Sequence, residues 1–342
     1  MTTDVLICDD SDMARKQMAR ALPGDWDLNV RTAVDGQDCL NQLRQGHSEL
    51  LFLDLNMPVM DGYQVLETIR REDLPVLVIV VSADIQPDAR RHVLSLGALG
   101  FVKKPLDPNE LAHVLIESGF YRPDEAPGTA ANRHSPSPVD NPVDGLNGQW
   151  RDALQEVANV AMGQAGDHLA RLLNVFVQLP VPRVTELAVS DLRMALASAQ
   201  NGDSEAAVGQ GFIGGGITGE AILLFSDSAL SDMAQLVGFG RDPDDHQAQE
   251  VLGDMTSVLA GAFLKGLSDQ LNTRFSVSPP AILGHQISIA ELIEQNRHRW
   301  TRMLAIELNY RIDCHGIRCD LLLLMTEESL TPLQQKLAFL ME

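Results

Sequence analysis

Four short and continuous apolar runs constrain the first 120 residues more than any other feature of the sequence. The runs are VLIC at 5–8, LLFLD at 50–54, VLVIVVS at 76–82 and GFVKK at 100–104. Helical patterns such as DMARKQMARAL and PNELAHVLIES separate or follow them. Such runs are typical of strands covered on both faces, so the alternation predicts a doubly wound parallel sheet. The site of such a sheet lies at the carboxyl ends of its strands.

A proline-rich segment divides the chain. Residues 121–148 hold five prolines and almost no large apolar side chains. The segment cannot bury enough surface to fold, so we expect a loose and partly extended linker. It separates an N-terminal domain, 1–120, from a C-terminal domain, 149–342, and a length of 342 residues is enough for two cores.

Charge and composition exclude several classes of protein. The formal net charge of −21 argues against nucleic acid as a partner, because binding to the phosphate backbone needs a basic surface. No apolar run reaches the roughly 20 residues of a bilayer span, and the N-terminus is not a signal peptide. We therefore expect a cytoplasmic protein that does not bind membranes. Four cysteines are too few for a disulfide framework and lack the spacing of a zinc site.

Five polar residues stand at the ends of the predicted strands. They are Asp9, Asp10, Asp54, Ser82 and Lys104. Converging carboxylates suit Mg²⁺, which takes oxygen ligands and keeps several waters. With the cation bound, one carboxylate can act as a nucleophile toward a phosphoryl group, while Lys104 and the Ser82 hydroxyl hold the phosphoryl oxygens.

The segments CDDSDMAR, FLDLNMPVMDG, VVSAD and FVKKPL together closely resemble the receiver domain of bacterial response regulators. The resemblance implies a five-stranded flavodoxin-like sheet and a histidine kinase of the CheA type as phosphodonor. It also implies roles for individual residues: Asp54 as phosphoacceptor, Asp9 and Asp10 as Mg²⁺ ligands with Asp54 and the backbone carbonyl of Asn56, Ser82 and Lys104 as sensors of the phosphoryl group, and Phe101 at the aromatic switch position.

The second domain contains an internal repeat with a shift of 98 residues. Asp152, Glu156, Asn159 and Pro182 of the first copy recur as Glu250, Asp254, Ser257 and Pro280. In each copy, strand-like segments follow a helical pattern. The repeat predicts a pseudo-symmetric α/β domain with two long and similarly placed helices.

Asp152, Glu156 and Asn159 share one stripe of the first of these helices, opposite an apolar face that starts at Leu154. With Pro182 at its spacing, this pattern resembles the receiver phosphatases typified by the chemotaxis proteins CheC and CheX, related in fold to the middle domain of the flagellar switch protein FliM. The resemblance implies that Glu156 pairs with the lysine of a phosphorylated receiver, and that Asn159 positions the attacking water.

The second copy departs from this pattern. Asp254 is one methylene shorter than a glutamate, and Ser257 carries its hydroxyl on a much shorter arm than an amide. We expect a weakened or inactive site there; the alternative is that this stripe binds a regulatory partner.

The leading hypothesis is an enzyme that hydrolyses the aspartyl phosphate of a separate CheY-type regulator, under control of its own receiver. One alternative is a chemotaxis or flagellar-switch adaptor that binds without catalysis. Another is a phosphatase that acts on its own Asp54, within one chain or across a homodimer. The residues leave open the identity of the kinase, the oligomeric state and whether phosphorylation activates.

Overall fold

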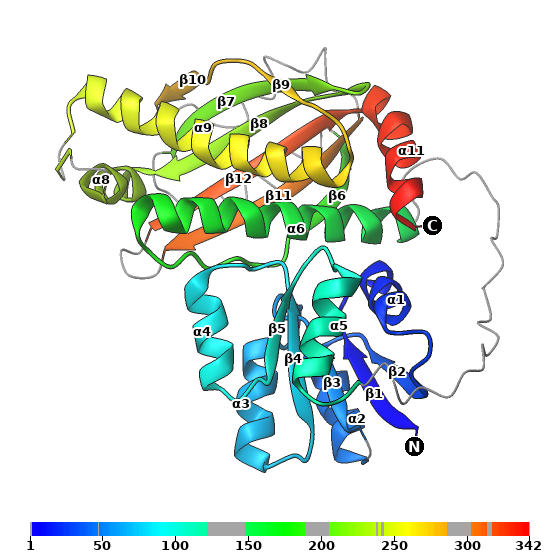
Figure 1. The fold of residues 1–342 in the computed structure, drawn as a ribbon. Coiled ribbons are helices and arrows are strands. Elements are labelled where there is room, and N and C mark those ends of the chain that lie inside the picture. Colours follow the sequence, from blue (N-terminus) through cyan, green and yellow to red (C-terminus); the bar gives the residue numbers. More distant parts are fainter. Residues whose placement is uncertain are drawn as a thin grey trace. The chain divides into compact units, whose positions relative to one another are not determined.

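The computed structural model describes residues 2–46, 48–121, 148–188, 205–236, 239–240, 243–285, 302–312 and 317–341. Contacts divide the chain into two units, Met1–Asp152 and Ala153–Glu342 (Figure 1). The predicted linker falls almost entirely on residues outside the described ones, and so does Cys314.

The first unit is built on a five-stranded parallel sheet with strand order β2-β1-β3-β4-β5. Its strands and helices alternate along the chain: β1 (Thr3–Cys8), α1 (Asp12–Ala21), β2 (Leu28–Ala33), α2 (Gly36–Arg44), β3 (Leu50–Leu53), α3 (Gly62–Glu72), β4 (Leu77–Ser82), α4 (Pro87–Ser95), β5 (Gly100–Lys103) and α5 (Pro108–Glu117). Apolar residues of α1 and α5 share one core with the sheet, and those of α2, α3 and α4 share another. The predicted doubly wound sheet is confirmed.

The four strands expected from the apolar runs are present within one residue of their predicted ends, except that β1 begins two residues earlier. The fifth strand, β2, follows from no apolar run. Its sequence, LNVRTA, mixes polar and apolar residues because β2 is an edge strand whose side chains are mostly exposed or half-buried.

The second unit contains an antiparallel sheet with strand order β10-β7-β8-β12-β11-β6, and β9 pairs with β7. Its first half comprises α6 (Gly148–Leu173), β6 (Arg183–Ala188), β7 (Glu205–Gly214), β8 (Ile217–Ser226) and α8 (Asp227–Leu236). Its second half comprises α9 (Asp245–Gln270), β9 (Ser276–Val277), β10 (Ala281–His285), β11 (Arg302–Ile312), β12 (Ile317–Thr326), the short η3 (Glu327–Ser329) and α11 (Leu330–Met341).

The backbone reproduces the sequence repeat. Both α6 and α9 have 26 residues, and their ranges differ by the repeat shift to within one residue. Each is followed by an asparagine in the left-handed region, Asn174 with φ 54° and Asn272 with φ 45°. This conformation favours asparagine over most other residues with a side chain and is common where helices end. The repeat is therefore a structural duplication as well as a sequence pattern.

The two halves exchange their outer strands. The hairpins β7–β8 and β11–β12 meet at the centre of the sheet, where β8 pairs with β12. Strand β6 of the first half then pairs with β11 of the second, and β10 of the second half pairs with β7 of the first. The registers correspond: Arg183 lies opposite Glu307, as Ala281 lies opposite Gly209. The sheet consequently has pseudo-two-fold symmetry.

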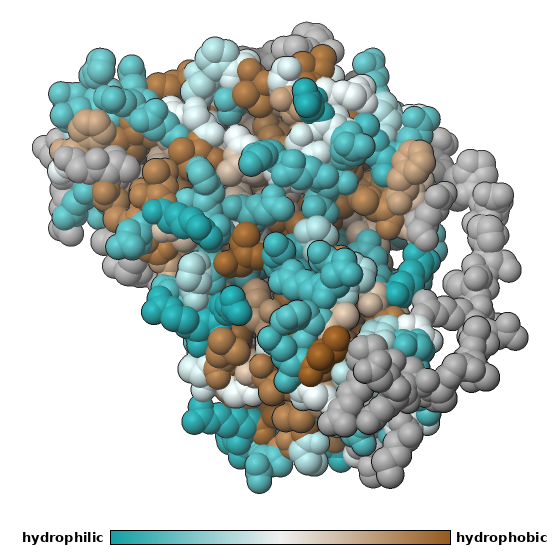
Figure 2. Space-filling view, in the orientation of Figure 1, coloured by the Kyte–Doolittle hydropathy of each residue, from teal (hydrophilic) through white to brown (hydrophobic). Residues whose placement is uncertain are grey.

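Both long helices lie against one side of the sheet, and they run side by side (Figure 1). Gly266 of α9 makes this approach possible, since a Cβ added there would lie 2.7 Å from the Cα of Ala161 on α6. Hydrophobic and hydrophilic residues are interspersed on the face drawn in Figure 2. None of the helices in the described ranges has the length and apolar character needed to span a bilayer.

Candidate functional site

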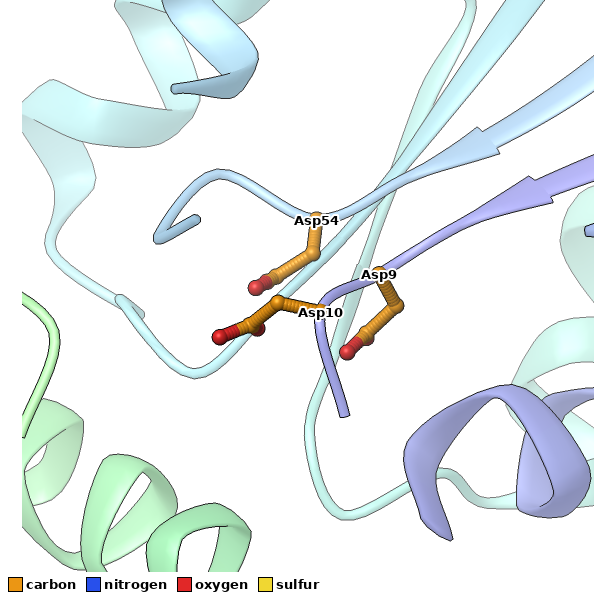
Figure 3. Close-up of side chains that lie close together, drawn as sticks. All are labelled: Asp9, Asp10 and Asp54. Carbon is orange, nitrogen blue, oxygen red and sulfur yellow. The ribbon is translucent and has the colours of Figure 1, made fainter. Parts of the chain in front are cut away.

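Three carboxylates gather at the carboxyl ends of two neighbouring strands (Figure 3). Asp9 and Asp10 follow β1 directly, and Asp54 follows β3, which pairs with β1 in parallel. One oxygen from each side chain lies within 4.8 Å of the others. Three acidic side chains this close repel one another unless cations compensate their charge. The arrangement has the donor set of a site for a hard cation such as Mg²⁺.

Lys104 supplies one positive charge to this cluster. Its Nζ lies 2.7 Å from Oδ2 of Asp9 and 3.5 Å from Oδ1 of Asp54, and the side chains are 4%, 7% and 0% exposed, respectively. The lysine follows β5, so it reaches the acids from the far side of β4. Ser82, at the end of β4, is fully buried, and its Oγ accepts a hydrogen bond from the backbone N–H of Asp84.

Asp9 and Asp10 have different surroundings. Oδ1 of Asp9 accepts a hydrogen bond of 2.9 Å from the backbone N–H of Ser11, and Oδ2 is the oxygen near Lys104. Asp10 is half-buried. Burial, and then repulsion from Asp9, raises the pKa of Asp10 to about 6, against the opposing attraction of Lys104. A bound cation would favour the ionised form of this carboxyl group.

The loop after Asp54 is folded tightly beneath the acids. The backbone N–H of Gly62 donates to the carbonyl oxygen of Leu55, and a Cβ at Gly62 would lie 2.3 Å from the carbonyl oxygen of Asp54. Only glycine fits there. Asn56, in the same loop, is 9% exposed, and its Nδ2 has no hydrogen-bond partner among the described residues.

Phe101, in β5, is half-buried and packs against the core formed with α2, α3 and α4. The structure thus brings the strand-end residues expected from the sequence to one edge of the sheet. Phe101 lies within β5, the strand that Lys104 follows. Their individual roles stay predictions.

Sequence reasoning missed one residue of this edge, Arg15. Its Nη1 donates to the carbonyl oxygens of Asp9 and Asp10, at 2.7 and 3.0 Å. Nothing in the sequence separates Arg15 from the other basic residues of α1. The only signal is its position, one turn into the helix that follows the acids.

The second predicted site lies on α6. Glu156 and Asn159 are three residues apart on this helix, and the two residues are 5% and 4% exposed in the chain as a whole. The sequence pattern places both residues opposite the apolar face of the helix, which by itself does not predict their burial. Buried residues occur all round α6, and this helix contacts α9 through Ala161 and Leu179 through Gly166. Oδ1 of Asn159 is buried and makes no hydrogen bond with any residue that the structure describes.

The equivalent stripe on α9 is different. Asp254 and Ser257 are both exposed, and Oγ of Ser257 donates to the carbonyl oxygen of Gly253 at 2.9 Å. A serine that bonds to its own helix in this way has no hydroxyl proton left to donate to a ligand.

Comparison with known proteins assigns the first unit. The family model described as the response regulator receiver domain matches residues 5–116. A probable transcriptional regulatory protein NarL of Mycobacterium tuberculosis is 31% identical over 205 residues, which cover 57% of this chain and 92% of that protein. The chain therefore belongs to the response regulators of two-component signalling. The match to the family model ends at residue 116 and does not extend to the second unit.

Other relatives share a smaller part. A protein-glutamate methylesterase/protein-glutamine glutaminase of Clostridium acetobutylicum is 33% identical over 111 residues, or 32% of each chain. The match to the crystal structure of Thermotoga maritima FliY covers 56% of this chain and 98% of the FliY chain, with 16% identity and a TM-score of 0.45. A likeness at that level supports no conclusion about activity.

Proposed function

We propose that this protein is a receiver-controlled phosphatase. In this proposal a histidine kinase phosphorylates Asp54, and the second unit hydrolyses the aspartyl phosphate of a separate receiver through Glu156 and Asn159. The observation that carries the receiver half is the cluster of Asp9, Asp10 and Asp54, whose ligand oxygens lie within 4.8 Å of one another.

Each of the receiver residues has a separate role in this proposal. Asp9, Asp10 and Asp54, with the carbonyl of Asn56, would hold Mg²⁺, which offsets the negative charge gathered when a phosphoryl group arrives. Asp54, which follows β3 at the centre of the sheet, is the nucleophile in this proposal, as the resemblance to receiver domains implies. Lys104 and Ser82 contact the new phosphoryl oxygens. Phe101 repacks when Ser82 moves toward them.

The α6 residues supply what a phosphorylated receiver lacks. Such a receiver already holds its own cation and lysine, so hydrolysis needs a water in line with the leaving oxygen. The amide oxygen of Asn159 can accept a hydrogen bond from this water without a change of protonation. The carboxylate of Glu156 pairs with the incoming receiver's lysine. Oδ1 of Asn159 has no hydrogen-bond partner among the described residues, so it is available to accept a hydrogen bond from water. Because Asn159 is 4% exposed, the role also requires that this face of α6 be uncovered before a separate receiver docks.

Labelling with a small phosphodonor tests the receiver half. Acetyl phosphate with Mg²⁺ is expected to label the wild-type chain and to leave Asp54→Asn unlabelled, as measured by intact-protein mass and acid-stable but base-labile phosphate. Persistent labelling of Asp54→Asn would show that another residue is the acceptor.

Phosphate release tests the second unit. A separately phosphorylated CheY-type receiver is mixed with wild-type protein, Asn159→Ala or the matched variant Ser257→Ala at the equivalent position of α9. We expect hydrolysis to fall by at least tenfold in Asn159→Ala and to be unchanged in Ser257→Ala. Equal rates for all three proteins contradict the role of Asn159, and binding without wild-type turnover identifies an adaptor. Asp54→Asn in the same assay separates control by the receiver from self-hydrolysis.

A further inference from the structure

Arg15 holds the backbone of both N-terminal acids at once. It lies on α1, one turn after the Ser11 N-cap, and its side chain is 12% exposed. Nη1 donates to the carbonyl oxygens of Asp9 and Asp10, at 2.7 and 3.0 Å. Nη2 lies 3.3 Å from Oδ1 of Asp12. One guanidinium group thus joins the acid-bearing segment to the helix that follows it.

These contacts fix the direction of the two peptide groups. The carbonyl of each residue and its side chain leave the same Cα, so holding the carbonyls on the α1 side limits where the carboxylates can point. The Ser11 N–H bond to Oδ1 restrains Asp9 in addition. The carboxylate of Asp10 accepts a hydrogen bond from its own backbone N–H, and Arg15 holds the carbonyl group of the same residue.

We propose that Arg15 is a positioning residue for the Mg²⁺ site, acting through the carbonyls of Asp9 and Asp10 and not through contact with the cation. This inference rests on the proposed function, since it takes Asp9 and Asp10 as ligands. Groups that orient metal ligands typically change metal affinity by 10–100-fold when they are removed.

The direction in which Mg²⁺ affinity changes on substitution of Arg15 tests the proposal. A guanidinium near a cation site repels the cation, so removal of its charge alone strengthens Mg²⁺ binding. Loss of positioning weakens Mg²⁺ binding. The two effects have opposite signs, and Arg15→Lys, which keeps the charge but loses the planar fork, distinguishes between them.

The experiment is titration of the full-length, metal-free protein with MgCl₂ in a calorimeter. The proteins are wild type, Arg15→Met, Arg15→Lys and the control Lys16→Met, which removes the neighbouring charge of α1, ion-paired with Asp12. We expect the Mg²⁺ dissociation constant to rise at least tenfold in Arg15→Met, to rise by a smaller factor in Arg15→Lys, and to stay unchanged in Lys16→Met. Urea unfolding in chelator measures stability separately, because a merely structural role lowers stability but leaves the dissociation constant unchanged.

Each outcome decides the proposal. A dissociation constant in Arg15→Met that equals or falls below the wild-type value overturns the role of Arg15 while the metal site itself stands. If Arg15→Met does not fold, Arg15→Lys is compared with the wild type instead. A wild-type Mg²⁺ dissociation constant in Arg15→Lys then refutes the positioning role of Arg15. If the wild-type chain binds no Mg²⁺, the magnesium site of the proposed function fails and this inference fails with it.

Discussion

Lys104 Nζ lies 2.7 Å from Oδ2 of Asp9, and both side chains are almost completely buried. Removing one partner of such a pair leaves a buried charge without compensation, which is destabilising by about 3–5 kcal/mol. We therefore expect Lys104→Met to lower the free energy of unfolding at pH 7 by about that amount in urea titrations. Addition of Mg²⁺ should recover part of the loss. The exposed neighbour Lys103 gives the matched control. A similar loss in Lys103→Met would contradict the assignment to the buried pair.

The pKa of Asp10 predicts a pH dependence in the metal-free protein. Burial raises this pKa from 3.8 to about 6, so between these values the folded chain binds a proton that the unfolded chain has released. Its contribution to the free energy of unfolding therefore falls as pH rises from about 4 to 6, by at most about 3 kcal/mol. Urea titrations in chelator should show a flatter dependence over this range in Asp10→Asn than in the wild type. Parallel curves would refute the raised pKa.

The backbone conformation of Val59 is expected to lower the free energy of unfolding of the protein. It has φ 69°, it is 85% exposed, and the N–H of Met60 donates across it to the carbonyl of Pro58 at 2.8 Å. A β-branched residue in such a turn is strained by on the order of 1–3 kcal/mol. Val59→Gly should therefore raise the free energy of unfolding by about 1 kcal/mol, after the greater entropy of glycine in the unfolded chain is subtracted.

Val34 provides the comparison for this prediction. It is also exposed, at 51%, and it is not among the residues with positive φ. Val34→Gly is expected to destabilise the protein slightly in the same chemical unfolding assay. A gain at Val34 as large as the gain at Val59 would rule out backbone strain as the cause.

Two glycines of α9 test the packing of the long helices. A Cβ at Gly266 would lie 2.7 Å from the Cα of Ala161, whereas a Cβ at Gly261 meets nothing within 4 Å. Gly266→Ala should separate α6 from α9 and lower stability by about 1–3 kcal/mol. Gly261→Ala should raise it by up to about 1 kcal/mol, because alanine favours the helix. Thermal unfolding of both variants gives the comparison, and equal shifts would show that the helices do not meet at Gly266.

The receiver edge could be predicted because each of its residues adjoins a strand in sequence. Asp9, Asp54, Ser82 and Lys104 follow or end apolar runs, and parallel strands bring their carboxyl ends to one edge. Arg15 could not be found in this way, since it reaches the same edge from a helix whose charges look like those of any solvated face. Strand β2 was missed because its sequence has neither a continuous apolar run nor a clean alternation.

The internal repeat of the second unit could be predicted from the sequence, but the pairing of its strands could not. The 98-residue shift gave the two helices, and the equivalence of Asn174 and Asn272 confirms it at the level of the backbone. No local pattern could show that β6 pairs with β11, since partner choice depends on residues far away in the chain. The burial of Glu156 was likewise unforeseen, because helical periodicity gives the side opposite the core but not what covers it.

The crossed pairing of β6 and β10 has a consequence for how this unit can change. Neither duplicate contains all the neighbours of its own strands, so each would leave an open sheet edge if it were made alone. The side chains of Asp254 and Ser257, which are exposed on α9, can therefore change without altering the strand pairing, while each half of the sheet remains necessary as the scaffold of the other.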